Sequence, residues 1–88
     1  MMKSNDMKKG TVVFMKGTGW RATIADNMRG NIRVATVEGI FTEMGSIYVW
    51  DIAYALVPRG NGDGFDRVKI ELTAKQIKAS KLVAAAGF

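Results

Sequence analysis

The stretch Gly45-Ser46-Ile47-Tyr48-Val49-Trp50-Asp51-Ile52-Ala53-Tyr54-Ala55-Leu56-Val57 decides the fold. Its first part, from Ser46 to Trp50, is rich in β-branched and aromatic residues, which is typical of a strand. Asp51 then interrupts the apolar run, and the apolar residues that follow have helical spacing. We therefore predict a strand, one helical turn capped by Asp51, and a short strand that ends at Pro58.

The alternative is one continuous strand from Ile47 to Val57. Asp51 would then share a face with Val49 and Ala53, and an unpaired buried carboxylate costs free energy. In either reading, alternation along the strand places Tyr48 and Trp50 on the face opposite Val49. We expect this aromatic face to point outward as a patch for a ligand or a second copy, unless a C-terminal helix covers it.

Composition bounds the chemistry of the chain. Its 88 residues are enough for one domain, and they include no cysteine and no histidine. Disulfides, thiolate ligands and the commonest general base are therefore excluded, and we expect no cofactor, no metal and no enzymatic activity. No apolar run approaches the ~20 residues of a membrane-spanning helix. The polar start, Met1 to Asp6, does not resemble a signal peptide, so a cytoplasmic location is expected.

Charge is unevenly distributed along the chain. Residues 1–34 carry seven basic and two acidic side chains, and residues 35–58 carry three acidic and no basic ones. The remainder adds three positive charges, for a net charge of +5. Basic ends favour nucleic acid or another anionic partner. A solvated surface with scattered lysines explains the same numbers.

Turn chemistry divides the rest of the chain. Residues 1–8 are polar and aperiodic, which predicts a flexible tail. Residues 9–72 alternate between short strands and glycine-rich loops, with strands expected at 11–16, 20–26, 32–38 and 66–72 besides the central stretch. Gly39 is expected to form a bulge, with Ile40 and Phe41 continuing the strand, and Thr42–Gly45 to form a turn.

A helix is predicted at the end of the chain. Thr73 and Gln76 have the spacing of a capping box, and the helix should run from Ala74 to about Ala86. Gly87 suits a left-handed cap on which Phe88 would fold back. We expect residues 73–88 to pack on one end of the sheet.

Short strands, tight turns and a helical turn before the last strand favour a small barrel. Residues 8–58 resemble an SH3-like barrel in three places: Lys9–Val13, Trp20–Ile24 and the run from Val49 to Leu56. The fold class implied is mainly β, a five-stranded SH3-like barrel with a C-terminal α-helix.

Two further resemblances concern shorter segments. Trp20, Gly45-Ser46 and Ala55-Leu56 are similar to residues of the plasmid-borne type II dihydrofolate reductases, which are tetramers of SH3-like barrels around a pore. The pore run Gln-Ile-Tyr of that family is replaced here by Tyr48-Val49-Trp50, so the outline carries over and the activity does not. Residues 41–48 and 72–76 also resemble uncharacterised small proteins of cyanobacteria and their phages, which implies no activity.

Two functions from different classes follow. The first is a non-catalytic protein-interaction or self-assembly module, whose aromatic patch consists of Trp20, Phe41, Tyr48 and Trp50. The alternative is a small barrel that binds nucleic acid by stacking bases on these aromatics inside a basic rim. The candidate rim residues are Lys8, Lys9, Lys16, Arg21, Arg29 and Arg33.

Overall fold

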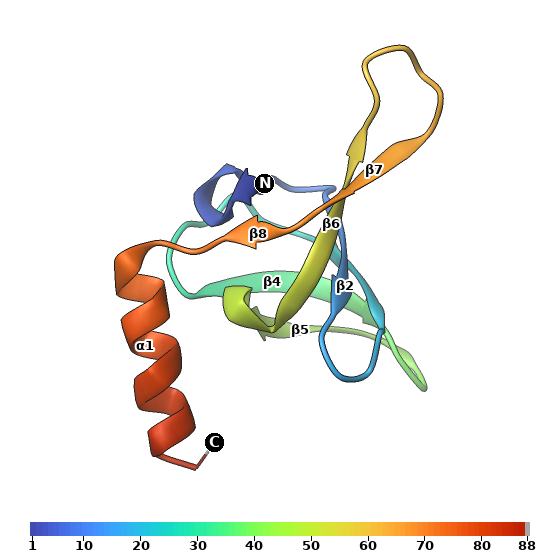
Figure 1. The fold of residues 1–88 in the computed structure, drawn as a ribbon. Helices are drawn as coiled ribbons and strands as arrows, with labels where there is room; N and C mark the ends of the chain where they lie inside the picture. The colour runs from blue at the N-terminus through green and yellow to red at the C-terminus, as the bar shows by residue number, and fades with distance from the viewer. Residues whose placement is uncertain (88) are drawn as a thin grey trace.

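The computed structural model describes residues 1–87 and is mainly β, with one helix at the C-terminus (Figure 1). The elements in chain order are β1 (Met2–Lys3), η1 (Ser4–Asp6), β2 (Val12–Met15), β3 (Arg21–Ile24), β4 (Ile32–Glu38), β5 (Thr42–Tyr48), η2 (Val49–Asp51), β6 (Ile52–Pro58), β7 (Phe65–Val68), β8 (Ile70–Glu71) and α1 (Ala74–Ala85). The expected packing of Phe88 lies outside the described residues.

Six antiparallel strands form the main sheet in the order β5-β4-β3-β2-β6-β7. β1 and β8 form a separate parallel pair. Within residues 1–87 no ladder joins β5 to β6 or β7, so the hydrogen-bonded sheet does not close on itself. The predicted mainly β class with a C-terminal helix is confirmed, but the sheet has six strands rather than five.

The central stretch is interrupted, as predicted, but the turn begins earlier. It is the 3-10 turn η2, and Asp51 ends this turn instead of capping a following one. The turn buries Val49 completely and leaves Asp51 exposed, which avoids a buried carboxylate. The backbone N–H of Lys16 donates to the Asp51 carbonyl at 2.7 Å and holds η2 against the end of β2.

The β4–β5 hairpin differs from the prediction in two ways. Its register runs from Glu38 opposite Thr42 to Ile32 opposite Tyr48 without a shift, so there is no bulge at Gly39. Residues 39–41 form a tight turn, and residues 42–45 belong to β5 instead of a turn. A Cβ at Gly39 would come within 2.7 Å of the Trp20 indole, so the aromatic ring needs a glycine beneath it.

Alternate residues of the strands face one core. Its fully buried apolar members are Met7, Val13, Ala22, Ile24, Ala35, Val49, Ile52 and Ala55. A hydrophobic pattern would place Ile32 of β4 in the core and Arg33 in solvent, but the opposite is observed. Arg33 and Ala35 point inward, while Ile32 is 43% exposed. An arginine therefore occupies a core position of the central hairpin.

The two Nη atoms of Arg33 are satisfied by carbonyl oxygens and by the side-chain amide of Asn5, whereas its Nε has no hydrogen-bond partner within residues 1–87. Its Nη1 donates to the backbone oxygens of Gly30 (2.9 Å) and Ile32 (3.0 Å). Its Nη2 donates to the Ser4 carbonyl and to Asn5 Oδ1, both at 3.1 Å. Burial lowers the pKa of Arg33, and the negative charge of Asp26 partly opposes this shift.

These bonds show that the predicted flexible tail is wrong. Residues 1–8 include β1, which pairs with β8, and η1, whose Ser4 is fully buried. Met7 is 1% exposed and belongs to the core. The segment is ordered because its backbone carbonyl and the Asn5 amide are the acceptors that a buried guanidinium requires.

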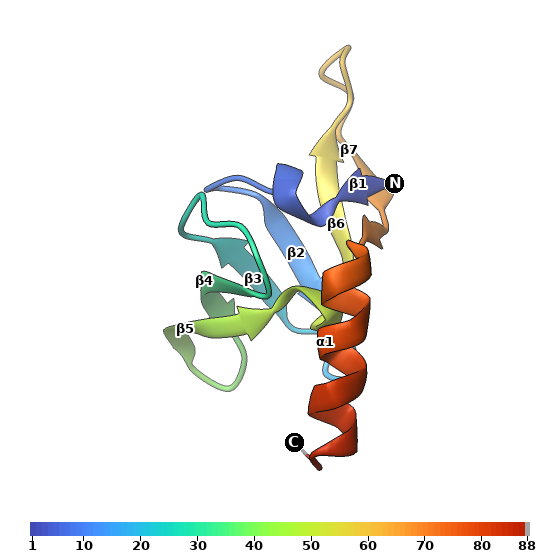
Figure 2. The ribbon, with the colours of Figure 1, turned by 90° about the vertical axis from the view of Figure 1, so that its left-hand side faces the viewer.

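The predicted capping box of α1 is confirmed. Thr73 Oγ1 accepts from the Gln76 N–H at 3.1 Å, and Gln76 Oε1 accepts from the Thr73 N–H at 2.9 Å. Gln76 is buried: its Oε1 also accepts from Ser4 Oγ at 2.6 Å, and its Nε2 donates to the Gly30 carbonyl at 2.8 Å. The helix contacts η2, but its later turns project past the sheet and leave Leu82 63% exposed (Figure 2).

The strand predicted at 66–72 is divided at Lys69. β7 before it pairs with β6, and β8 after it pairs with β1. The Lys69 carbonyl accepts from the Met2 N–H at 2.9 Å, so the chain changes partners at this residue. The N-terminal segment is thus held from two sides, by Arg33 and by β8.

Replacing Arg33 should destabilise the whole fold. Arg33→Ala leaves buried carbonyls without donors, so we expect a loss of about 2–4 kcal/mol in the free energy of unfolding, measured by urea denaturation. Arg33→Lys should not restore it, because an ammonium cannot reproduce the planar fork. Arg29→Ala, at an exposed site nearby, is the matched control and should change stability by less than about 0.5 kcal/mol. Equal stability of the Arg29 and Arg33 variants would contradict this account.

Candidate binding surfaces

The predicted aromatic patch divides into two groups. Trp20 lies over Gly39 and therefore beside the turn that holds Phe41, at one end of the β4–β5 hairpin. Tyr48 and Trp50 lie at the opposite end, where β5 passes into η2. Seven residues of strand separate the groups, or about 20 Å. The four side chains do not form one surface.

Tyr48 and Trp50 stack on each other, with ring centroids 4.5 Å apart and an angle of 12° between the rings. Trp50 is half-buried and packs against the core, and α1 contacts the turn to which Trp50 belongs. Tyr48 is 36% exposed and lines a small hollow of about 160 Å³ with Ile32, Ser46 and Ile47. The surface contribution of this pair therefore comes from Tyr48.

The outer edge of β5 carries backbone N–H and C=O groups that pair with no other strand of the sheet. At the two ends of the ladder, the Val49 N–H donates to the Asn31 carbonyl (3.0 Å) and the Gly39 N–H donates to the Phe41 carbonyl (3.2 Å). Odd-numbered residues of β5 therefore direct their backbone groups toward β4, and even-numbered residues direct theirs away from it. The outward-directed residues are Thr42, Met44, Ser46 and Tyr48, all of them exposed.

Figure 2 shows β5 at the margin of the sheet. Sheet edges are usually protected by proline, lysine, bulges or short length. β5 has none of these: it is seven residues long, in unbroken register, and Glu43 is its one charged residue. Its backbone can accept another strand.

The predicted basic rim does not surround the aromatics. Arg33 is fully buried, so its assignment to the rim is wrong. Arg21 is exposed and lies 3.6 Å from Glu38, which partly neutralises it. The other four basic side chains are exposed but scattered: Lys8 and Lys9 precede β2, Lys16 follows it, and Arg29 lies in the loop before β4.

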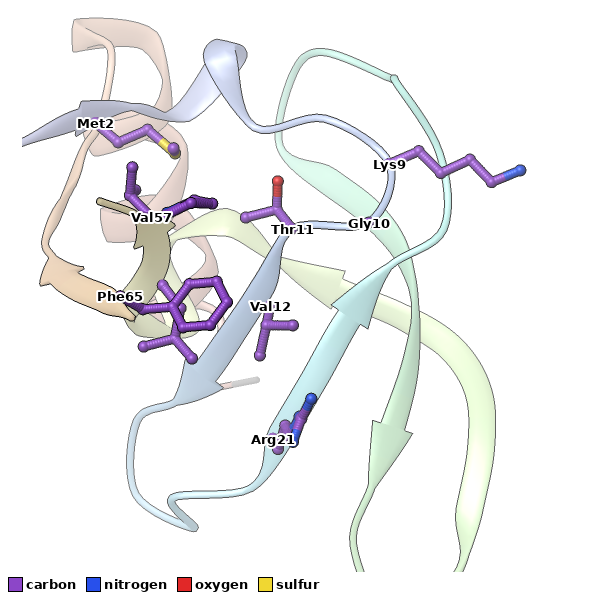
Figure 3. Close-up of a pocket in the computed structure, with 10 residues that line it drawn as sticks. Met2, Lys9, Gly10, Thr11, Val12, Arg21, Val57 and Phe65 are labelled. Atoms are coloured by element: carbon purple, nitrogen blue, oxygen red, sulfur yellow. The ribbon is translucent and has the colours of Figure 1, made fainter. Parts of the chain in front are cut away.

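A groove of about 470 Å³ lies where the β6–β7 hairpin passes the start of β2 (Figure 3). Phe65, which is 57% exposed, faces Val12 across it. Arg21 lies at one end, and Lys9 lies at the rim and extends away from Phe65. The ten lining residues are Met2, Lys9, Gly10, Thr11, Val12, Arg21, Leu56, Val57, Pro58 and Phe65, and none is acidic.

The same side of the sheet carries further aromatic contacts. Phe14 and Tyr54 stack with centroids 5.0 Å apart, and the Arg67 guanidinium lies 5.1 Å from the centre of the Tyr54 ring. Register places these residues on the same face as Val12 and Leu56. The predicted site did not include Phe14, Tyr54, Phe65 and Arg67, because alternation relates residues within one strand and the register between strands is needed to place all four on one face.

Two findings concern other kinds of site. Among residues 1–87, His, Cys, Asp and Glu side chains nowhere gather in the threes that a metal ion needs. The one helix described is too short to cross a bilayer.

Comparison of the chain with protein-family models, with curated proteins and with solved structures finds no match.

Truncating the two stacked aromatics should separate their roles. Trp50→Ala removes core packing as well as the stack, so we expect a loss of about 2–3 kcal/mol in the free energy of unfolding. Tyr48→Ala removes the stack and a 36% exposed side chain that lies outside the core, so about 1 kcal/mol is expected. Urea denaturation measures both. A neutral Trp50→Ala would show that the indole is a surface group.

Proposed function

We propose that the chain is a non-catalytic protein-interaction module that receives an extended strand of its partner on the free edge of β5. Its framework is proposed to be an SH3-like barrel. In support, β2 to β5 form a consecutive meander, a 3-10 turn follows, and β6 returns to pair with β2. In this arrangement β5 and β6 are neighbours in sequence but are not hydrogen-bonded.

One observation carries the proposal: the unprotected outer edge of β5. Thr42, Met44 and Ser46 direct unpaired backbone donors and acceptors to solvent, and Tyr48, whose carbonyl starts η2, directs its N–H there. The side chains of all four residues lie on the exposed face of the sheet. Main-chain bonds to an added strand supply affinity, and the alternating side chains supply specificity. Tyr48 and Met44, which is 69% exposed, are the large side chains of this face.

Ser46→Pro tests the edge directly. Proline removes the N–H that points away from β4 and leaves the β4–β5 ladder intact, so the variant should keep its fold by circular dichroism. Ten-residue peptides selected from a displayed random library on the immobilised wild-type chain should lose at least tenfold in affinity for Ser46→Pro. Lys78→Ala, on an exposed position of α1, is the control and should bind as the wild type does.

Peptides that bind wild type and Ser46→Pro equally would show that the partner docks elsewhere. Amide hydrogen exchange gives an independent readout. The amides of Met44, Ser46 and Tyr48 should exchange fast in the free chain and slow down with bound peptide, whereas Ile47 should be protected in both states.

A second function, nucleic-acid binding, is favoured by the groove of Figure 3. An exposed Phe65 offers a stacking surface, Lys9 lies at the rim of the groove and Arg21 at one end, and no carboxylate lines it. Bases stack on such aromatics while basic residues hold the phosphates.

Binding of a fluorescent oligothymidine tests this second function. We expect affinity to fall with rising salt, with a log–log slope of about −1 to −2 for the few cations available. Phe65→Ala should weaken binding by roughly tenfold, because stacking contributes about 1–3 kcal/mol per base. Phe41→Ala, which truncates an exposed aromatic that does not line the groove, is the control. Absence of binding at low salt would eliminate this function.

A further inference from the structure

We propose that the strand received by β5 is β5 of a second copy of this chain, paired antiparallel about a two-fold axis at Gly45. This inference rests on the proposed function and names its partner. A two-fold interface must be self-complementary, because the same patch occurs on both copies. In an antiparallel pair of identical strands, each residue of β5 must therefore be compatible with the residue that faces it in the reversed strand of the other copy.

The backbone satisfies this condition in one register. The outward-directed residues are all even-numbered, and antiparallel bonds must join outward-directed residues of both strands. With the axis at Gly45, Thr42 pairs with Tyr48 and Met44 pairs with Ser46 of the other copy. All four outward-directed residues of each strand then have partners, and Gly45 faces its own copy in a non-hydrogen-bonded pair.

The side chains fit the same register. At the axis, where two backbones are closest, the residue is glycine, and a Cβ built on it meets nothing within 4 Å. On the exposed face, each Met44 lies opposite a small Ser46, and each Tyr48 lies opposite Thr42. Large side chains thus meet small ones along the seam.

Exposed apolar residues also lie at the ends of the seam. Ile40 and Phe41, which are 83% and 73% exposed, belong to the turn between β4 and β5. Because Thr42 pairs with Tyr48 in this register, the turn of one copy lies at the same end of the seam as the start of η2 of the other copy. Two apolar side chains that a monomer leaves in water would then lie near the partner.

Charge permits the approach of two copies. Residues 35–58, which include β5, hold no lysine or arginine, although the whole chain carries +5, so the two paired strands bring no cations of their own together. Each Glu43 lies opposite Ile47, four residues from its own counterpart, or about 13 Å. This exceeds the screening length of about 8 Å at physiological ionic strength. Association should therefore hold or strengthen as salt rises.

The test uses the absence of cysteine from the chain. Cα atoms of a non-hydrogen-bonded pair lie about 4.5 Å apart, within the range of disulfides. Gly45→Cys should therefore form a disulfide-linked dimer under mild oxidation with diamide at micromolar concentration. Thr42→Cys is the matched control on the same strand: its counterpart lies six residues away, about 20 Å, so it should stay unlinked.

The unmodified chain supplies a second measurement. Sedimentation equilibrium should give twice the 9.6 kDa monomer mass, and Ser46→Pro should reduce it to the monomer mass. A folded Gly45→Cys variant that stays unlinked, or links no faster than Thr42→Cys, overturns the inference. If library peptides still bind the β5 edge in that case, the proposed function stands and only the second copy is excluded.

Discussion

A buried guanidinium without a carboxylate partner is the constraint on which the rest of this structure depends. Within residues 1–87, every hydrogen-bond acceptor of Arg33 is a carbonyl or amide oxygen. Its Nε has no hydrogen-bond partner there, and the negative charge of Asp26 only partly opposes the lowering of its pKa by burial. A charge buried in this way is tolerated only when most of its donors are satisfied, so the acceptors of the two Nη atoms must be fixed in place. The N-terminal segment and the loop before β4 are ordered because they supply these acceptors.

Gln76 extends the same network to the C-terminal helix. Its side chain joins Ser4, Thr73 and Gly30, and two of these residues, Ser4 and Gly30, also accept from Arg33 through their backbone carbonyls. Both ends of the chain are therefore tied to one loop. Because β1 pairs with β8 and α1 contacts η2, neither terminal segment pairs with β5. The free edge is thus a consequence of where the buried network holds the termini.

The sequence predicted the local features well and the long-range ones poorly. Thr73 and Gln76 lie three residues apart, so their capping box could be predicted from spacing alone. The turn after Tyr48 was placed to within a few residues, because the cost of burying Asp51 is local as well. Arg33 could not be assigned to the core, because its acceptors at Ser4 and Asn5 lie 29 and 28 residues away. Because these long-range contacts cannot be predicted from the sequence, residues 1–8 were predicted to be a flexible tail. For the same reason, the face of β4 that carries Arg33 was not predicted to be buried.

The candidate site also combines features that depend on nearby residues with features that depend on strand pairing. Tyr48 and Trp50 stack on each other, but Trp50 lies in η2 instead of a strand and packs against the core, and Trp20 and Phe41 lie at the other end of β5. That separation follows from the β4–β5 register, which places the turn at residues 39–41. β5 is one margin of the six-stranded sheet, and Phe65 lies on β7, which is the other margin. Pairing through β5 would therefore leave both grooves accessible and carry them on one continuous twelve-stranded sheet. Two linked copies of a weak site bind a long ligand more tightly than either does alone. The two proposed surfaces are thus compatible, and self-assembly at one margin would compensate for the small number of cations at the other.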